Sequence, residues 1–386
     1  MKISSVEAKI CHVSEKTNWF FLAVGDEHGH VGLGEATLNG WEMPQLSFLD
    51  AWRKRLMGQS PQAVFPKLVV YPHGAGGLIA SSVISALEQA LTDLCAQQEG
   101  VPVYEWLGGA RREAVRVYAN INRGARDRNP EGIAKAALHA VGQGFGAVKI
   151  APFDGVYWAD ADKPGFKALV QKGIERVAAI REAVGPDIDV MVDCHWRFNE
   201  HQSLALLEQL KPLKLFWIEC PVSENPHGFD ALERVHEATN RMQLRLSGAE
   251  LQIGERGFAP FIESHRLDVV MPDIKYAGGY AQMLRIAELC ERESVHFSPH
   301  NPSGPICNLA SLHLCASAKA FLILEHQLAE SPLYEAVVGG YKPRLMNGCF
   351  QLPQGPGLGA GLDQRVLDQH PYEALAENAN LDPRLG

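Results

Sequence analysis

Acidic residues and histidines stand at the ends of short apolar runs in the second half of the chain. The clearest run covers residues 189–195, where an apolar, β-favouring stretch ends in Asp193 and is followed two residues later by His195. Because successive side chains of a strand point to opposite faces, a strand that continues through His195 directs both side chains to the same face. Such a strand offers one pocket a carboxylate that can bind a metal ion and an imidazole that can move protons.

Seven such runs are spaced almost evenly. They end at Lys149, Asp193, Glu219, Glu250, Asp273, His300 and Glu325. Successive ends are 44, 26, 31, 23, 27 and 25 residues apart, close to the roughly 30 residues that one strand–helix unit of a (β/α)₈ barrel needs. In such a barrel the carboxyl ends of the strands form the catalytic face. The spacing therefore predicts an α/β fold in which seven polar side chains meet at the mouth of a TIM-like barrel.

Different sequence patterns flank this predicted barrel. Residues 1–115 begin with β-favouring runs around a turn and continue with a helical pattern between about 78 and 107, which predicts a small α+β domain. The barrel is expected over 116–330. The loop-rich segment 331–386, with its glycines and prolines, is expected to pack back on the first domain.

The composition limits the classes of partner. A net charge of −9 without an obvious basic face argues against nucleic acid. The eight cysteines are scattered without a Cys-x-x-Cys pair, which fits a reducing compartment and no structural zinc site. The N-terminus lacks the apolar core of a signal peptide and no stretch approaches the length of a membrane span, so we expect a cytoplasmic protein without membrane contact. A homo-oligomer is an open expectation that no residue pattern demonstrates.

Three of the strand-end carboxylates suggest a metal site. Asp193, Glu219 and Glu250 come from consecutive predicted strands and form an all-oxygen set suited to Mg²⁺, which leaves coordination positions for both oxygens of a substrate carboxylate. For any one of them, a solvated acid or a helix cap is the simpler interpretation. Three in register favour a metal site.

The next two strand ends suggest a general base. A carboxylate hydrogen-bonded to an imidazole fixes the tautomer and raises the basicity of the ring, so Asp273 is expected to prepare His300 to take a proton near neutral pH. The prolines of segment 298–305 restrict the backbone around His300. This restriction distinguishes His300 from an ordinary structural histidine.

Together these residues resemble the enolase superfamily, mandelate-racemase subgroup. The resemblance rests on the order of the seven strand ends, on segments 86–94, 102–104 and 108–109 ahead of the barrel, and on the Ile-Glu-Cys-Pro sequence at 218–221. It implies an α+β capping domain over a modified (β/α)₇β barrel, with Mg²⁺ as cofactor and removal of a proton α to a carboxylate as the chemistry. By the same resemblance, Glu325 hydrogen-bonds the developing enediolate oxygen.

Two departures from the racemases of this subgroup narrow the expected reaction. Racemases carry Lys-x-Lys on the first catalytic strand, whereas this chain has Lys149 followed by Ala151 at the second position, so two-base racemisation is disfavoured. Racemases carry Asp-x-Asn where this chain has Asp193 and His195. This Asp-x-His pattern resembles galactonate, gluconate or mannonate dehydratases, in which the histidine protonates the leaving hydroxyl.

The expected reaction is β-elimination of water from an acid sugar or similar hydroxy acid, giving a 2-keto-3-deoxy acid. Mg²⁺ holds the substrate carboxylate, His300 removes the C2 proton, and His195 protonates the departing 3-hydroxyl. Lys149 adds positive charge beside the substrate carboxylate, or forms an ion pair with a metal ligand. Epimerisation, lactone cycloisomerisation and hydroxyproline-type dehydration are alternatives through the same enediolate. A non-catalytic metal-binding barrel is an alternative of another class.

Two assignments stay open in the sequence. Many relatives read Gly-Glu at the third metal ligand, but here the glycine is one position earlier, so Glu255 is the alternative to Glu250. Substrate selection is expected in the capping-domain loops and beside the proposed acid and base, although any one such residue is more simply a surface or packing residue. The candidates are Asn18, Trp19, Asn39, Gly40, Trp41, Glu42, His73, Asn122, Arg123, Trp196, Arg197 and Asn301.

Overall fold

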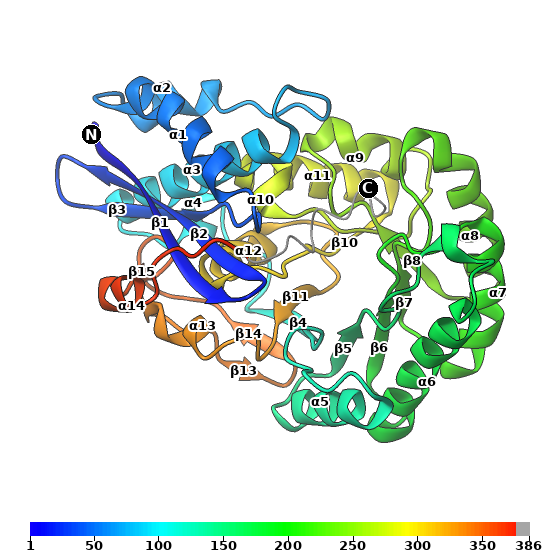
Figure 1. The fold of residues 1–386 in the computed structure, drawn as a ribbon. Helices are drawn as coiled ribbons and strands as arrows, with labels where there is room; N and C mark the ends of the chain where they lie inside the picture. The colour runs from blue at the N-terminus through cyan, green and yellow to red at the C-terminus, as the bar shows by residue number, and fades with distance from the viewer. Residues whose placement is uncertain (376–386) are drawn as a thin grey trace.

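The computed structural model describes residues 1–375, in which an α+β capping region lies beside a barrel (Figure 1). The capping region opens with an antiparallel meander whose strands pair in chain order: β1 (Ile3–Ser14), β2 (Thr17–Asp26) and β3 (Val31–Glu35). Helical segments follow: α1 (Glu42–Leu56), α2 (Pro61–Val64), η1 (Phe65–Lys67), α3 (Gly77–Glu99) and α4 (Val103–Trp106). Meander and helix both lie where the sequence predicted them.

Helix α3 forms the core of the capping region. Glycines on β3 let the two backbones approach closely, since a Cβ at Gly34 would lie 2.0 Å from the Ala86 carbonyl oxygen. By length and composition, α3 is the one helix of residues 1–375 that could cross a membrane, so the expectation that no stretch approaches that length is wrong. In the fold, 89% of its most apolar window is buried inside the protein, as in the core helix of a globular protein.

Eight parallel strands form the barrel. They are β4 (Ala114–Asn120), β5 (Ala147–Ile150), β6 (Asp189–Asp193), β7 (Trp217–Glu219), β8 (Arg245–Gly248), β9 (Val269–Val270), β10 (His296–Phe297) and β11 (Leu324–Gln327). Strands β4 to β10 pair in sequence order, and β11 pairs with β4. A bridge between Phe297 and Phe321 joins the remaining edge. The barrel is therefore closed, as predicted, and β4 begins two residues before the expected start at 116.

Helices cover the outside of the barrel (Figure 1). They are α5 (Pro130–Gly142), α6 (Phe166–Val184), α7 (Glu200–Leu210), α8 (Phe229–Arg241), α9 (Gly254–Ile262), α10 (Ile274–Ala277), α11 (Gly279–Glu293) and α12 (Pro305–Ser317), with the single turns η2 (Trp158–Asp160), η3 (Lys211–Leu213) and η4 (Pro226–Gly228). Side-chain caps define several starts, for example Asn199, which forms a capping box with Gln202 at α7.

The inward-facing side chains of the barrel form two layers. The apolar layer consists of Tyr118, Ala147, Met191, Trp217, Met271 and Ile323. The polar layer consists of the residues two positions later: Asn120, Lys149, Asp193, Glu219, Asp273 and Glu325. Because strand side chains alternate with a period of two, each polar residue stands above an apolar one on the same face. The period therefore places the polar groups at the carboxyl end of the barrel over an apolar floor.

After β11 the chain continues with short elements rather than a long helix, which gives the (β/α)₇β pattern. These are α13 (Leu333–Ala336), β12 (Val338–Gly340), β13 (Leu345–Met346), β14 (Cys349–Gln351), β15 (Ala360–Leu362) and α14 (Gln364–Gln369). Strand β14 pairs with β4, and the His12 N–H donates to the His370 carbonyl at 3.0 Å. The segment thus contacts both barrel and capping region as far as residue 375, and the rest of predicted segment 331–386 lies outside the described residues.

Buried carboxylates hold the capping region against the barrel. Glu35 accepts two backbone N–H bonds in the first turn of α12, at 2.7 and 2.8 Å. Glu88 accepts two at the start of α11, at 2.8 and 3.1 Å. Asp93 accepts from Leu33 and from Leu358, both at 2.8 Å. The bonds to Glu35 and Glu88 satisfy donors at helix starts, and those to Asp93 satisfy donors of β3 and of the C-terminal segment; all would otherwise be buried unpaired.

Candidate active site

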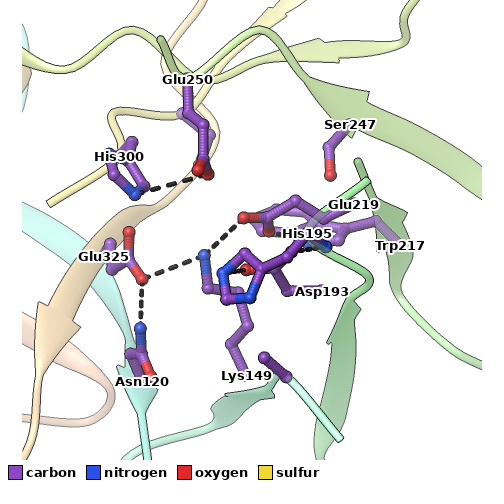
Figure 2. Close-up of polar contacts among 12 residues, drawn as sticks. Asn120, Lys149, Asp193, His195, Trp217, Glu219, Ser247, Glu250, His300 and Glu325 are labelled. Atoms are coloured by element: carbon purple, nitrogen blue, oxygen red, sulfur yellow. Dashed lines mark hydrogen bonds and ion pairs between the residues drawn. The ribbon is translucent and has the colours of Figure 1, made fainter. Parts of the chain in front are cut away.

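Three carboxylates meet at the mouth of the barrel (Figure 2). Asp193 and Glu219 end β6 and β7, and Glu250 follows β8 by two residues. One oxygen of each lies within 4.8 Å of the others, and all three side chains are buried. Within residues 1–375 Glu250 Oε2 has no hydrogen-bond partner, although His300 Nε2 lies 3.4 Å from it (Figure 2). Among the described residues Glu255 is not part of this cluster; it lies in the first turn of α9.

The electrostatics of this cluster suit a cation. Burial, followed by the charges of Asp193 and Glu219, holds the pKa of Glu250 well above its usual range. Burial also raises the pKa of Glu219 to about 8. Burial pushes the pKa of Asp193 upward as well, but the contacts with His195 and the charge of Lys149 together outweigh it, and the pKa of Asp193 is about 2. Three buried acids, one of which has an oxygen without a hydrogen bond among the described residues, fit a hard divalent ion, whose charge would stabilise their ionised forms.

Lys149 lies between two carboxylates of the polar layer. Its Nζ is 2.7 Å from Glu219 Oε1 and 3.0 Å from Glu325 Oε1, and the side chain is 1% exposed. Figure 2 shows this bridge across the barrel mouth. The ion pair that the sequence left as an alternative role for Lys149 is therefore present, and its contribution to the chemistry stays a prediction.

His195 reaches the site by a turn instead of a strand. Strand β6 ends at Asp193, and His195 and Trp196 have φ of 45° and 54°, so the extended conformation assumed in the prediction does not occur. The turn nevertheless brings His195 Nε2 to 2.7 Å from Asp193 Oδ2. The His195 side chain is 36% exposed, whereas the Asp193 side chain that it contacts is 4% exposed.

His300 is paired with Asp273 as predicted. Its Nδ1 lies 2.9 Å from Asp273 Oδ2, and its Nε2 lies 3.4 Å from Glu250 Oε2. Burial lowers the pKa of His300, although the hydrogen bond to Asp273 opposes this effect. The ammonium of Lys275 also binds Asp273 Oδ2. Lys275 was missed, and its signal was a lysine two residues after a predicted catalytic acid.

Glu325 is fixed by three donors. Asn120 Nδ2 donates at 2.7 Å, the Asn301 N–H donates at 2.8 Å, and Lys149 completes the set. Asn120 was missed in the sequence because it is uncharged, and the signal was its place at the end of β4. Asn301, a predicted substrate-binding residue, is fully buried and supports Glu325.

Several other predicted substrate-binding residues take part in internal contacts. Asn18 is buried and its Nδ2 donates to Glu42 and to the Glu373 carbonyl. Trp19 is buried and packs edge-on against Tyr334. The side chain of Asn39 accepts from the Asn18 N–H, and that of Glu42 from the Gly40 N–H.

The remaining candidates lie nearer the barrel loops. Asn122 Oδ1 accepts from the Ala151 N–H, Arg123 pairs with Glu330, and Arg197 donates to the Val156 carbonyl. Trp196 and His73 line one surface pocket together with Glu224. Trp41 precedes α1 and is partly exposed.

A capped (β/α)₇β barrel with acids, histidines and a lysine at its mouth defines a class of barrel enzymes that bind a divalent metal ion. Two family models match the chain: "Mandelate racemase / muconate lactonizing enzyme, N-terminal domain" over residues 6–108, and "Enolase C-terminal domain-like" over residues 132–366. The protein belongs to the enolase superfamily, in its mandelate racemase/muconate lactonizing enzyme branch. The predicted family and fold are confirmed, and the protein is an enzyme of this superfamily, whose members bind a divalent metal.

Individual relatives cover most of the chain. The "D-galactonate dehydratase family member RspA" of Cellvibrio japonicus is 30% identical over 97% of this chain and 96% of its own. The "D-gluconate dehydratase" of Thermoproteus tenax is 27% identical over 89% of this chain and 68% of its own. A solved mandelate racemase/muconate lactonizing enzyme-like protein from Rubrobacter xylanophilus superposes with a TM-score of 0.84, at 31% identity, covering 97% and 98% of the two chains.

Proposed function

We propose that the protein is a Mg²⁺-dependent sugar-acid dehydratase that eliminates the 3-hydroxyl of its substrate. The observation that carries the proposal is the pair of imidazoles beside the carboxylate cluster, each held by its own carboxylate: His300 by Asp273 and His195 by Asp193. Two-base racemisation is disfavoured because the position where racemases carry their second lysine is occupied by Ala151, which is buried. The names of the relatives, D-galactonate and D-gluconate dehydratases, support a small hydroxy acid as substrate.

Asp193, Glu219 and Glu250 would hold the Mg²⁺, since they form the all-oxygen cluster. When bound, the ion supplies positive charge that stabilises the negative charge developing on the substrate carboxylate. Lys149 adds charge beside this cluster.

His300 acts as the base. Its Nδ1–H donates to Asp273, so the lone pair that takes the C2 proton is on Nε2, the nitrogen that lies 3.4 Å from Glu250 Oε2. Asp273 stabilises the imidazolium that results. His300 thereby begins the elimination by breaking the C2–H bond.

His195 acts as the acid. Its Nε2, now 2.7 Å from Asp193 Oδ2, delivers its proton to the departing 3-hydroxyl. The C3–O bond breaks, water leaves, and the enol that remains tautomerises to the 2-keto-3-deoxy acid. The partial exposure of His195 suits a group that meets the distal part of the substrate.

Glu325, on β11, supports Lys149. Burial favours a higher pKa for Glu325, but Lys149, His300 and the Asn301 N–H together outweigh it, and the pKa is lowered. An ionised Glu325 accepts hydrogen bonds from Asn120 and Asn301, and the cationic donor beside it is Lys149. An ionised carboxylate has no hydrogen to donate, so we assign Glu325 the task of orienting Lys149, and Lys149 the hydrogen bond to the substrate oxygen.

The test is incubation with MgCl₂ and a panel of aldonates and aldarates, followed by an assay for 2-keto acids. We expect at least one diastereomer to be dehydrated. No turnover across the panel, together with turnover of hydroxyprolines or lactones, would overturn the substrate class. No turnover of any of these acids by the folded, metal-loaded protein would favour the non-catalytic alternative.

A further inference from the structure

The three candidate metal ligands are flanked by residues in the left-handed backbone region. Cys220, Ala249 and Trp196 have φ of 45°, 68° and 54°. Cys220 directly follows Glu219, and Ala249 directly precedes Glu250. Trp196 lies three residues after Asp193. Residues with a Cβ seldom adopt this region, so such turns persist only where their surroundings hold them.

One buried carboxylate, Glu224, binds the backbone of Ala249 and lies beside the other two residues. Its two oxygens lie 3.0 and 3.1 Å from the Ala249 nitrogen, which donates to them. The Cys220 thiol lies beside the same Gly248 position as Glu224 Oε1, and Trp196 lines the same pocket as Glu224; burial raises the pKa of Glu224, and both side chains oppose this effect. The fit is tight, because a Cβ at Gly248 would lie 2.0 Å from Glu224 Oε1.

Glu224 is separate from the metal cluster itself. It is 6% exposed, follows β7 by five residues, and is not among the carboxylates whose oxygens converge. The backbone of β8 ends at Gly248, so Ala249 alone connects the barrel wall to the Glu250 ligand. A peptide rotation at Ala249 would therefore turn Glu250 away from its two partners.

We propose that Glu224 is the positioning residue of the metal site, holding three left-handed turns so that the carboxylates of Asp193, Glu219 and Glu250 meet at one point. The inference rests on the proposed function in taking Mg²⁺ as the ion these carboxylates bind. Residues that orient metal ligands from outside the coordination shell typically change metal affinity 10- to 100-fold when they are removed.

The experiment is calorimetric titration of Mg²⁺ into the metal-free protein, with folding checked by circular dichroism. Glu224→Ala should bind Mg²⁺ about 10- to 100-fold more weakly than wild type. Adding Ala249→Gly should restore much of the affinity, because glycine adopts positive φ without strain. The matched control is Glu88→Gln, which alters another buried carboxylate that accepts two backbone N–H bonds, and which should leave Mg²⁺ affinity unchanged.

The outcomes separate the two proposals. A wild type that binds no Mg²⁺ would overturn the metal assignment of the proposed function. A wild type that binds, with Glu224→Ala equal to it within about twofold, would overturn the role of Glu224. Failure of Ala249→Gly to restore any affinity would overturn positioning through that turn. If Glu224→Ala does not fold, Glu224→Gln takes its place; a loss of about 3- to 10-fold that Ala249→Gly reverses supports the proposal, and wild-type affinity contradicts it.

Discussion

Replacing Lys149 by methionine tests how far this side chain acts as a structural counter-charge. Its Nζ lies 2.7 Å from Glu219 Oε1 and 3.0 Å from Glu325 Oε1 in a buried position. Removing the cation leaves two buried carboxylates without their positive partner, and removing one partner of a buried ion pair costs about 3–5 kcal/mol of stability. We expect urea unfolding in EDTA at pH 8 to show a loss of that size in Lys149→Met.

A second substitution and a control separate this effect from general damage. Adding Glu325→Gln to Lys149→Met removes one of the two unpaired buried charges, so the double variant should be more stable than Lys149→Met by about 1–3 kcal/mol. The control Arg116→Met breaks an exposed pair with Asp189 and should cost less than about 1 kcal/mol. A loss below about 1 kcal/mol for Lys149→Met, or a double variant no more stable than the single one, would refute the reasoning.

Three further predictions concern stability, proton transfer and metal. Burial raises the pKa of Glu88 from 4.5 to about 7, so its contribution to stability is fully present below about pH 4.5 and is lost as the pH rises through 7. In urea unfolding, the unfolding free energy of Glu88→Gln relative to wild type should therefore rise by up to about 3 kcal/mol between pH 5 and pH 8. The same difference at both pH values would contradict this. His195→Asn should stop elimination but keep exchange of the C2 hydrogen with D₂O, whereas His300→Asn should abolish both, as followed by NMR; loss of exchange in both variants would mean that the acid is wrongly assigned. Mg²⁺ at 100 times its Kd should stabilise the fold by about 2.7 kcal/mol, measured by thermal unfolding, and activity that survives EDTA would remove the metal from the mechanism.

Strand alternation explains why the barrel and most of its polar layer were predictable. Each polar residue follows an apolar one by two positions, as Asp193 follows Met191, and this period is visible in the sequence. Asn120 obeys the same period after Tyr118. It was missed because an amide lacks the charge that marks the other strand ends.

Backbone turns and long-range packing explain what was not predictable. The turn that brings His195 back to Asp193 needs positive φ at two consecutive residues, His195 and Trp196, and the bulky side chain of Trp196 disfavours it. Trp19 lies on a strand, but the face that it occupies is covered by Tyr334 from the far end of the chain. A local pattern shows which residues share a face of a strand and cannot show what covers that face.

The contacts of Glu35, Glu88 and Asp93 have a consequence for how substrate enters. These carboxylates join the capping region to the starts of two barrel helices and to the returning C-terminal segment. A swing of the whole capping region would strip several buried donors of their acceptors at once, at about 1–3 kcal/mol for each. We therefore expect the capping region and the barrel to keep their relative orientation while substrate exchanges with solvent.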